Sequence, residues 1–388
     1  MTLSKQNKIL IVHNNYRHIG GEDISVEKEV TFLSKFNDVK TIYFNNEIKS
    51  YLKQFYYFFV NSNKESTNDF IKNYLEYKPD VVYIHNLWFK ASLGILKFLK
   101  NENVKVFIKI HNFRYDCASS FFKINHLNNK NYCNACGFSE KDSFLINKYF
   151  KESYLKSFLV ILFSKKYIKL VENSKFTVLV LTKFHFDYIK NKKYKFNRVK
   201  VFPNYLDLNT ITSTKENYII YAGRISYEKG VKELITSFLK VAKVNDVLRL
   251  AGDGPDLEKL KYKFRNSKNI LFDGYLDNDT VINLISKSKA VVTATRLYEG
   301  QPTLLCEASL LSVPSIYPRT GGIGEFFPEN YPFSFEQYNY EKLSEVFFNV
   351  LNSESLDFYG GENKKFIENK LEFNLMKKEF SHLLNYNE

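Results

Sequence analysis

Apolar residues in this chain occur as short runs separated by longer segments with helical spacing. The runs are rich in β-branched residues, which predicts buried strands, and segments such as Val231–Val241 and Thr280–Ser286 are predicted to be the helices between them. This alternation is typical of an α/β fold with parallel sheets and crossover helices. The predicted strands are Lys8–Val12, Lys40–Phe44, Val81–His85, Val104–Ile110, Phe176–Leu181, Val199–Phe202, Tyr218–Ala222, Val247–Ala251, Asn269–Phe272, Ala290–Ala294 and Ser315–Tyr317.

A chain of 388 residues favours two domains over one. We place the boundary near Pro203–Asp207, which gives two doubly wound domains at 1–205 and 206–370. A C-terminal helix at about 371–388 is expected to pack back on the first domain.

Composition is that of an ordinary globular protein, with 44% apolar and 25% charged residues. The apolar run Phe158–Phe163 is far too short to span a bilayer, and the first residues contain no secretory h-region. We therefore expect a cytoplasmic protein.

Charge is divided unevenly along the chain. Residues 1–205 carry 34 Lys and Arg against 17 Asp and Glu, a balance of +17, whereas 206–388 carry 22 against 25, a balance of −3. This asymmetry indicates an anionic partner for the first half. No helix-turn-helix, zinc-finger or RNA-binding pattern is present, so we expect a membrane face and no nucleic acid. In Ser143–Val171, aromatic residues alternate with lysines, which predicts a basic amphipathic helix on the inner membrane face; a core-facing helix is the alternative.

The segment Glu299–Glu307 follows the predicted strand Ala290–Ala294. Pro302 predicts a helix start, so Glu299 would lie in the strand-to-helix loop and Glu307 in the helix. Both carboxylates would then lie at the carboxyl end of a sheet, where open α/β folds bind ligands. Carboxylates accept hydrogen bonds from sugar hydroxyls and the amide groups at a helix start bind anions, which together suggest a nucleotide-sugar.

Other loops after strands have compatible chemistry. Arg224 and Lys229 follow Tyr218–Ala222 and suit a diphosphate. Glycine-rich turns that leave room for a base or phosphate follow several strands, at Gly20–Gly21, Gly252–Pro255, Gly274–Tyr275 and Pro318–Gly322. Asp277–Asp279 has the spacing of a metal-binding Asp-x-Asp pair, but its position before a predicted helix favours an N-cap.

The order of these motifs, together with Ile110–Asn112, resembles the family 4 retaining glycosyltransferases of the GT-B fold, including those of surface-polysaccharide assembly. The resemblance runs from Gly20 to about Phe326 and implies two Rossmann-like domains that face each other across a cleft, with the donor on the second domain. It implies that Arg224 and Lys229 hold the donor phosphates and that Glu307 binds the ribose.

The resemblance also implies roles near the donor sugar, which Glu299 and His111 would approach. Many members of the family carry an aromatic residue after the Glu-Gly pair, where this chain has Gln301. The identity of the donor sugar therefore cannot be inferred from the family. The remaining residues implied in donor binding are Gly20, Gly21, Gly252, Tyr275, Thr303 and Leu304.

Three of the four cysteines lie close together, and Cys133–Cys136 has zinc-knuckle spacing that Cys117 with His111 or His126 would complete. Reduced thiols in the cytoplasm are the favoured alternative. His85, at another predicted strand end, is either an acceptor contact or a buried structural histidine.

These expectations combine into a metal-independent, retaining transferase without a cofactor. Its donor would be a nucleotide-diphosphate sugar, UDP-linked, and its acceptor a glycan or lipid-linked saccharide of capsule, lipopolysaccharide or other envelope polysaccharide. The alternatives are another GT-B activity such as a nucleotide-sugar 2-epimerase, and a non-catalytic scaffold that binds membrane or nucleic acid.

Overall fold

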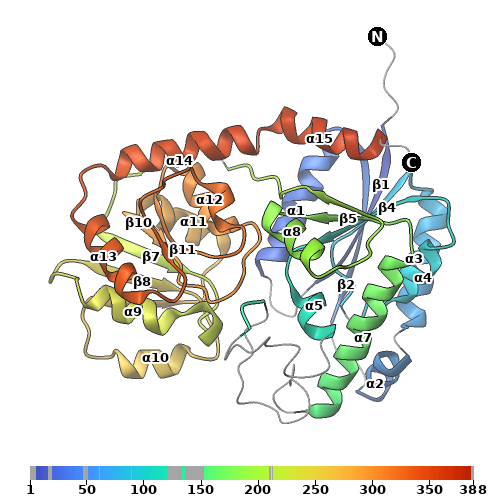
Figure 1. Ribbon diagram of the computed structural model, residues 1–388, viewed down its shortest axis with the longest axis horizontal. Coiled ribbons are helices and arrows are strands. Elements are labelled where there is room, and N and C mark those ends of the chain that lie inside the picture. Colours follow the sequence, from blue (N-terminus) through green and yellow to red (C-terminus); the bar gives the residue numbers. More distant parts are fainter. Residues whose placement is uncertain are drawn as a thin grey trace. The chain divides into compact units, whose positions relative to one another are not determined.

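The computed structural model describes residues 6–15, 20–46, 51–60, 62–88, 90–119, 133–135, 153–208, 211 and 213–385 (Figure 1). The chain divides into two compact units. Met1–Tyr205 together with Lys377–Glu388 form the first unit, and Leu206–Met376 form the second. Each unit is built on a six-stranded parallel sheet, which confirms the predicted pair of Rossmann-like domains.

The sheet of the first unit has the strand order β2-β1-β3-β4-β5-β6. Its central strands are almost fully buried apolar runs, as expected for parallel strands covered on both faces. β2 and β6 are the edge strands, and the last two residues of β6 are exposed. The strands are β1 (Lys8–Asn15), β2 (Asp38–Asn45), β3 (Val81–Ile84), β4 (Lys105–Ile110), β5 (Thr177–Val180) and β6 (Arg198–Val201).

Helices connect these strands, and two of them begin at side-chain caps. The Asn63 side chain accepts hydrogen bonds from the amides of Glu65 and Ser66, and Thr182 accepts one from the amide of His185. The helices of this unit are α1 (Gly21–Ser34), α2 (Tyr51–Val60), α3 (Lys64–Tyr77), α4 (Gly94–Leu99), α5 (Arg114–Ser119), α7 (Tyr154–Glu172) and α8 (Lys183–Asn191).

The sheet of the second unit has the order β12-β11-β10-β7-β8-β9. The chain therefore starts in the middle of the sheet, builds to one side and then returns to build the other, so that the order reverses between β7 and β10. β12 lies at a run too short and too polar to predict. The strands are β7 (Tyr218–Ala222), β8 (Val247–Ala251), β9 (Ile270–Gly274), β10 (Ala290–Val292), β11 (Ser315–Arg319) and β12 (Ser334–Glu336).

The helices of the second unit include one whose cap was predicted. The Asp277 side chain accepts hydrogen bonds from the amide and hydroxyl of Thr280, which confirms Asp277 as an N-cap. The elements are the 3-10 helices η2 (Tyr227–Lys229) and η3 (Ile323–Phe326), with α9 (Val231–Leu239), α10 (Leu257–Lys263), α11 (Asn278–Lys287), α12 (Thr303–Leu310), α13 (Tyr340–Leu351) and α14 (Leu356–Lys370).

The last helix, α15 (Phe373–Asn385), carries the chain back to the first unit. Phe380 on this helix is fully buried, and its ring lies 5.6–6.4 Å from four rings of the first unit. The final residues of the chain thus complete the core of its first unit. The four rings belong to Phe36, Tyr83, Phe107 and Phe202.

Candidate functional site

The second unit brings its predicted site residues to the carboxyl ends of β7 and β10. These strands are neighbours, and the strand order reverses between them. In open α/β sheets this switch point is where ligands bind, because the loops on its two sides diverge to opposite faces. The loops after both strands carry the charged residues singled out in the sequence.

A lysine and a glutamate from these two loops form an ion pair. Lys229 at the end of η2 donates from Nζ to Glu299 Oε1 at 2.6 Å, and both side chains remain between a quarter and a third exposed. Thr295, just after β10, donates from its hydroxyl to the same carboxylate oxygen at 2.9 Å. The pair is therefore fixed in orientation and accessible to a ligand.

Two glycines allow the backbone to approach this pair closely. Gly321 has φ +58°, and a Cβ there would lie 2.2 Å from the carbonyl oxygen of Glu299. The amide of Gly322 donates to that same oxygen at 2.8 Å. Gly230, with φ +66°, similarly has no room for a Cβ against the carbonyl of Ala294. The loop after β11 and the start of α9 thus hold Glu299 and Lys229 in place.

Arg224 directly follows Gly223 at the end of β7, and its side chain is exposed. Because Glu299 already balances the charge of Lys229, Arg224 supplies the excess positive charge of this group. Arg224, Lys229 and Glu299 thus follow the ends of two adjacent strands, an adjacency that the sequence did not specify.

The start of α12 differs from expectation. Thr303 was predicted to present its amide to an anion, but that amide donates to the carbonyl of Gln301 at 3.0 Å. Leu304 lies beside it, half-buried. Glu307 lies within α12 as predicted, although only 3% of it is exposed. Very little of the Glu307 side chain is therefore open to a ligand.

The glycine-rich turn after β8 has a structural function in this unit. Gly252, with φ +150°, has no room for a Cβ because the carbonyl oxygen of Gly223 would lie 1.9 Å away. Gly254 is placed likewise against the carbonyl of Ile225. Tyr275, after β9, is 71% exposed and so can be reached by a ligand.

In the first unit, two histidines singled out separately in the sequence form a pair. His85 Nδ1 lies 3.0 Å from His111 Nε2, and the two rings stack. Burial lowers the pKa of both imidazoles well below the ordinary value. Both rings are thus neutral at physiological pH, and the shared hydrogen bond leaves His111 with Nδ1 for any other contact.

The paired glycines at the start of α1 have a different environment from the glycines of the second unit. Gly20 is the N-cap of α1 with φ −124°, and its amide donates to Asp23 Oδ2 at 2.8 Å. Asp23 also pairs with the buried His13 at 2.8 Å. A Cβ on Gly21 would meet nothing within 4 Å, so no contact within the chain requires glycine at that position.

A buried ion pair in this unit was not predicted. Lys109 donates to both carboxylate oxygens of Glu29 at 2.7–2.8 Å, and both side chains have no exposed surface. The Tyr83 hydroxyl donates to Glu29 at 2.7 Å. Only the lysine inside the apolar run Lys105–Ile110 signals this pair in the sequence, because an inward-facing lysine in a buried strand needs an acid.

The cysteines give limited support for a metal site. Cys117 and Cys133 are buried with their sulfur atoms 3.7 Å apart, well beyond a disulfide bond. Cys136 and His126 lie outside the described residues. Within the described ranges, no three His, Cys, Asp or Glu side chains are grouped to hold a metal ion.

The predicted membrane helix is largely a core helix. Of Ser143–Val171, the structure describes residues 153–171, and α7 buries its apolar face from Leu159 onward in the first core. The core-facing alternative is therefore the correct one for this part of α7. Within the described residues, no helix has both the length and the apolar character to cross a membrane.

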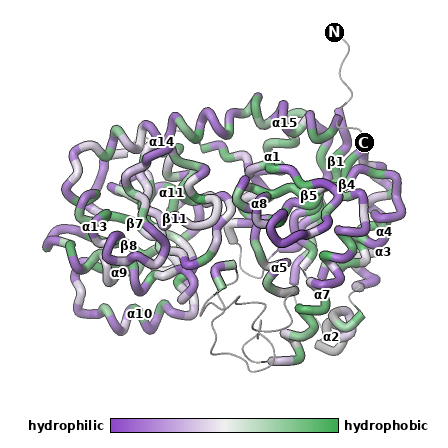
Figure 2. The backbone as a smooth tube through the Cα atoms, viewed as in Figure 1, coloured by the Kyte–Doolittle hydropathy of each residue, from purple (hydrophilic) through white to green (hydrophobic). Residues whose placement is uncertain are grey.

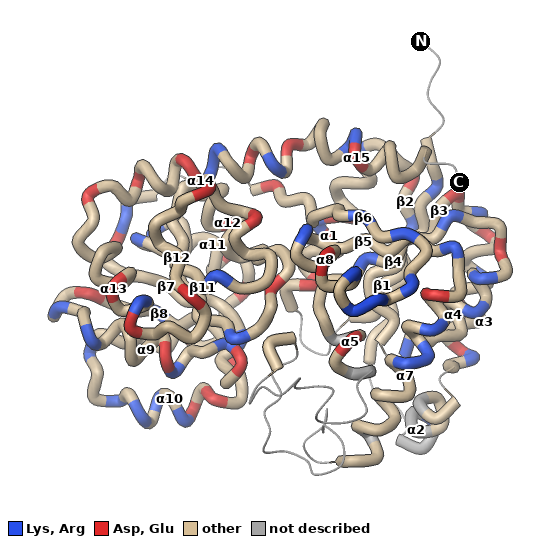
Figure 3. The backbone as a smooth tube through the Cα atoms, viewed as in Figure 1, with Lys and Arg blue, Asp and Glu red and all other residues tan. Residues whose placement is uncertain are grey.

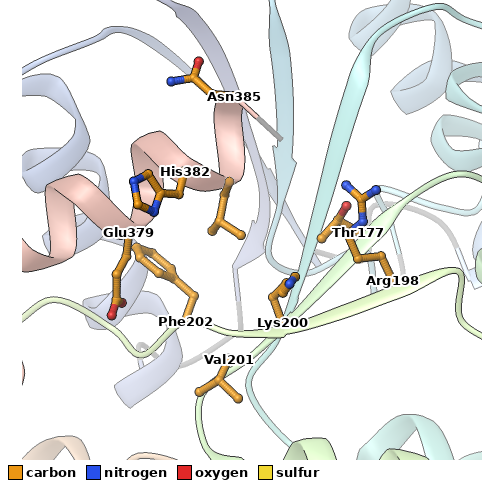
Figure 4. A pocket seen from close by; sticks show the side chains of 9 residues that line it. Thr177, Arg198, Lys200, Val201, Phe202, Glu379, His382 and Asn385 are labelled. Carbon is orange, nitrogen blue, oxygen red and sulfur yellow. The ribbon is translucent and has the colours of Figure 1, made fainter. Parts of the chain in front are cut away.

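A cavity of about 450 Å³ lies elsewhere in the first unit, between β6 and the end of α15 (Figure 4). Arg198 and Lys200 contribute to its lining, and His382 lies across from them on α15. None of the residues predicted to bind a donor or sugar lines this cavity. We assign it no part in the candidate site.

Comparison with known protein families gives a match within the second unit. Residues 209–372 match the family model of glycosyl transferases group 1. The match spans the ion pair of Lys229 and Glu299, together with Arg224 and Glu307.

Curated relatives match over shorter stretches. An uncharacterized glycosyltransferase of Methanocaldococcus jannaschii is 32% identical over 114 residues, which is 28% of this chain and 29% of that protein. The amylovoran biosynthesis glycosyltransferase AmsD of Erwinia amylovora is 30% identical over 111 residues, 27% of this chain and 30% of that protein. The chain thus spans less than a third of the length of either relative.

Solved structures match over nearly the whole chain. A sucrose-phosphate synthase from Thermosynechococcus elongatus has a TM-score of 0.72 at 12% identity, over 97% of this chain and 98% of that chain. HepE of Anabaena, solved with UDP and glucose, has a TM-score of 0.68 at 12% identity, over 98% and 99%. At such identity the likeness establishes the fold, which is the GT-B type of paired Rossmann-like domains.

Proposed function

We propose that this chain is a metal-independent, retaining glycosyltransferase that takes a sugar from a nucleotide-diphosphate donor, UDP-linked, bound to the second unit. The observation that carries the proposal is the partly exposed pair of Lys229 and Glu299 beside Arg224 at the switch point of β7 and β10. The match to glycosyl transferases group 1 over residues 209–372 and the HepE structure with UDP and glucose support it.

The chemistry of the site follows from its charges. Departure of the nucleoside diphosphate builds negative charge as the sugar becomes oxocarbenium-like. Arg224 and Lys229 would stabilise that charge in place, which is electrostatic preorganisation. Glu299 would orient Lys229 and accept hydrogen bonds from the donor sugar, and Glu307 would bind the ribose. His111 keeps its predicted role toward the transferred sugar.

The acceptor side of the proposal is a glycan or lipid-linked saccharide of envelope polysaccharide, made at the cytoplasmic face of the membrane. The similarity to AmsD, which is named for amylovoran biosynthesis, supports a biosynthetic role of this kind. Acceptor screening follows once the donor is known.

A thermal-shift panel tests the donor. UDP, GDP, ADP and their sugar conjugates are added to the wild type, to Arg224→Ala and Glu307→Ala, and to the control Arg265→Ala, which removes another exposed arginine of the same unit. At ligand near 100 times its dissociation constant, binding adds about 2.7 kcal/mol, a shift of several degrees. We expect one nucleotide to stabilise the wild type and the control, and not Arg224→Ala or Glu307→Ala. No shift with any nucleotide would favour the scaffold alternative.

Turnover then tests the reaction itself. Retention predicts that the product keeps the anomeric configuration of the donor by NMR, and activity is expected to survive EDTA. Rapid conversion of the donor sugar to its 2-epimer without an acceptor would instead identify an epimerase.

A further inference from the structure

Three histidines of the first unit lie on neighbouring strands or directly after them. His13 is on β1, His85 directly follows β3 and His111 directly follows β4. Hydrophobic residues make up most of β1 and β4 (Figure 2), and the histidines come toward the carboxyl ends of the strands. His13 and His85 are buried, whereas His111 is only partly buried. Of the three, His111 is therefore the one that a ligand can contact directly.

The ring of His85 is held in one orientation by the core. The ring of Tyr83 lies 4.5 Å from it between centroids, and the Tyr83 hydroxyl donates to the buried Glu29. Within the described residues, the His85 side chain forms one hydrogen bond, which joins its Nδ1 to His111 Nε2 at 3.0 Å. The packing of His85 therefore fixes the direction of the hydrogen bond that His111 shares with it.

The shared hydrogen bond allows two arrangements of protons, because both rings are neutral. In the first, His85 donates from Nδ1, its Nε2 is bare, and His111 carries its proton on Nδ1. In the second, His111 donates from Nε2, so that His85 carries its proton on Nε2. The two arrangements leave opposite groups at His111 Nδ1, an N–H in the first and a lone pair in the second.

The surroundings of His85 favour the first arrangement. Its Nε2 is buried and has no hydrogen-bond partner in the part of the chain that the structure describes. The second arrangement would place an N–H there, and buried N–H groups without an acceptor are rarer in native proteins than unpaired acceptors. The nearby Lys109 donates to Glu29 and to the carbonyl of Pro203, so it does not supply a donor to His85 either.

The electrostatic potential at this ring acts in the same direction. Burial lowers the pKa of His85, and the positive charge of Lys109 lowers it further. The first half of the chain has a charge balance of +17, and lysines and arginines are spread over this unit (Figure 3). A positive potential favours a bare lone pair over an N–H at the unpaired nitrogen.

His13 shows that a bare, unpaired nitrogen is tolerated here. Its Nε2 lies 2.8 Å from Asp23 Oδ1, and since a carboxylate accepts, Nε2 carries the proton. Its Nδ1 is buried without a partner among the described residues. In the neutral His13 ring that nitrogen is a lone pair, as inferred for Nε2 of His85.

We propose that His85 is a positioning residue that holds His111 as its Nδ1–H tautomer, so that His111 presents a hydrogen-bond donor to an oxygen atom of the ligand. The inference rests on the proposed function, which brings the transferred sugar to His111, and it narrows the role of that residue. With Nδ1 protonated and Nε2 accepting from His85, His111 cannot take a proton from a hydroxyl group. Its contribution is to bind and orient the sugar through an oxygen lone pair.

Nitrogen-15 NMR of the full chain, labelled at histidine, reads the tautomer directly, because protonated and bare ring nitrogens have well-separated shifts. A His111→Gln variant assigns the signals of that ring. At pH 7 we expect wild-type His111 to carry its proton on Nδ1. His85→Phe keeps an aromatic ring beside Tyr83 but cannot donate, so His111 should become a mixture of tautomers. His85→Asn, whose amide can donate from the place of Nδ1, should restore the wild-type tautomer.

The matched control is His185→Phe, which removes a buried imidazole that bonds to Tyr115 and not to His111. It should leave the tautomer of His111 unchanged, and thermal unfolding of every variant is measured alongside. A wild-type His111 protonated on Nε2 overturns the proposal, even if His85→Phe fails to fold. An unchanged tautomer in a folded His85→Phe overturns it as well.

Kinetics carry the test to the ligand, with UDP-glucose and its mono-deoxy analogues, or the same series of the donor that the thermal-shift panel selects. His85→Phe should lower kcat/KM about tenfold, since one hydrogen bond is lost, and His85→Asn should recover it. One deoxy donor should show the same loss with the wild type and no further loss with His85→Phe. Additive losses for every deoxy donor would refute a contact between His111 and a sugar hydroxyl. The expected tautomer without turnover of any donor would refute the proposed function, but would support the positioning of His111 by His85.

Discussion

The two units use the same sheet architecture but place their charges in opposite environments. In the first unit, Glu29 and Lys109 are paired with no exposed surface. In the second, Lys229 and Glu299 are paired with more than a quarter of each side chain exposed. A buried pair has lost its hydration and contributes only to the fold, whereas a partly exposed pair can exchange partners with a ligand. Ion pairing alone therefore does not mark a functional site; accessibility at the switch point does.

The largest effect is expected from breaking the buried pair. Lys109→Met leaves the Glu29 carboxylate without a cation in the core, which should lower the free energy of unfolding by about 3–5 kcal/mol. The chain has one tryptophan, Trp88, in the first unit, so its fluorescence in a denaturant titration follows this unit alone. Lys72→Met removes an exposed pair with Glu76 in the same unit and should cost about 1 kcal/mol or less. Equal losses for the two variants would refute the contrast.

The exposed pair should show the reverse behaviour. Lys229→Met is expected to change stability by about 1 kcal/mol or less, but to lower kcat by about 10²-fold, since it removes charge from the proposed site of the leaving group. Steady-state kinetics and a denaturant titration on the same preparation separate the two effects. A stability loss as large as that of Lys109→Met would mean that the pair serves the fold.

The two units should also differ in how their stability depends on pH, because all seven histidines belong to the first unit and none to the second. Burial lowers the pKa of His185 to about 3 and those of His85 and His111 well below 6.5. Below pH 6.5 these histidines therefore bind protons in the unfolded chain but not in the folded unit. The free energy of unfolding consequently decreases as the pH is lowered. For His185 the loss between pH 6.5 and 5 is about 2 kcal/mol.

Trp88 fluorescence should accordingly report an earlier acid transition than circular dichroism, which follows both units. His185→Phe is expected to flatten the pH dependence, and the exposed His382→Gln to leave it unchanged. Simultaneous loss of both signals would show that the units do not differ in this respect.

The glycines give the smallest effect. Gly321→Ala forces a Cβ against the Glu299 backbone and should cost more than about 1 kcal/mol, because its φ of +58° also disfavours alanine. Gly21→Ala meets nothing within 4 Å and is expected to be neutral or stabilising by about 0.5–1 kcal/mol. Thermal unfolding measures both. If Gly21→Ala weakens only donor binding, the glycine serves the ligand.

The fold was readable from the sequence because parallel strands are continuous apolar runs. The observed β7 and β8 have the predicted bounds. Among the strands of the described residues, only β12 was not predicted, because a strand of three residues has no period to detect. The pairs that polar side chains form with each other were harder to predict from the sequence. Lys229 and Glu299 were each singled out, but their pairing spans 70 positions and depends on which strands are neighbours.

The site residues and contacts that were not predicted have only weak signals in the local sequence. Thr295 resembles any threonine after a strand, although its position four residues before Glu299 was a clue. His85 and His111 were considered apart because contact between them requires β3 and β4 to be adjacent. The Thr303 amide was wrongly taken as available, because backbone hydrogen bonds such as the one to Gln301 leave no trace in residue type.

The return of α15 to the first unit has a consequence for synthesis on the ribosome. Phe380 completes a cluster with Phe36 and Tyr83, yet it is translated after the whole second unit. While the second unit is being synthesised, residues 1–205 therefore cannot complete their core, and part of it remains exposed to solvent. During that interval the nascent chain exposes aromatic surface of the kind that chaperones bind. A ribosome stalled before Phe380 should hold a first half that proteases cut readily, and release of the last few residues should protect it.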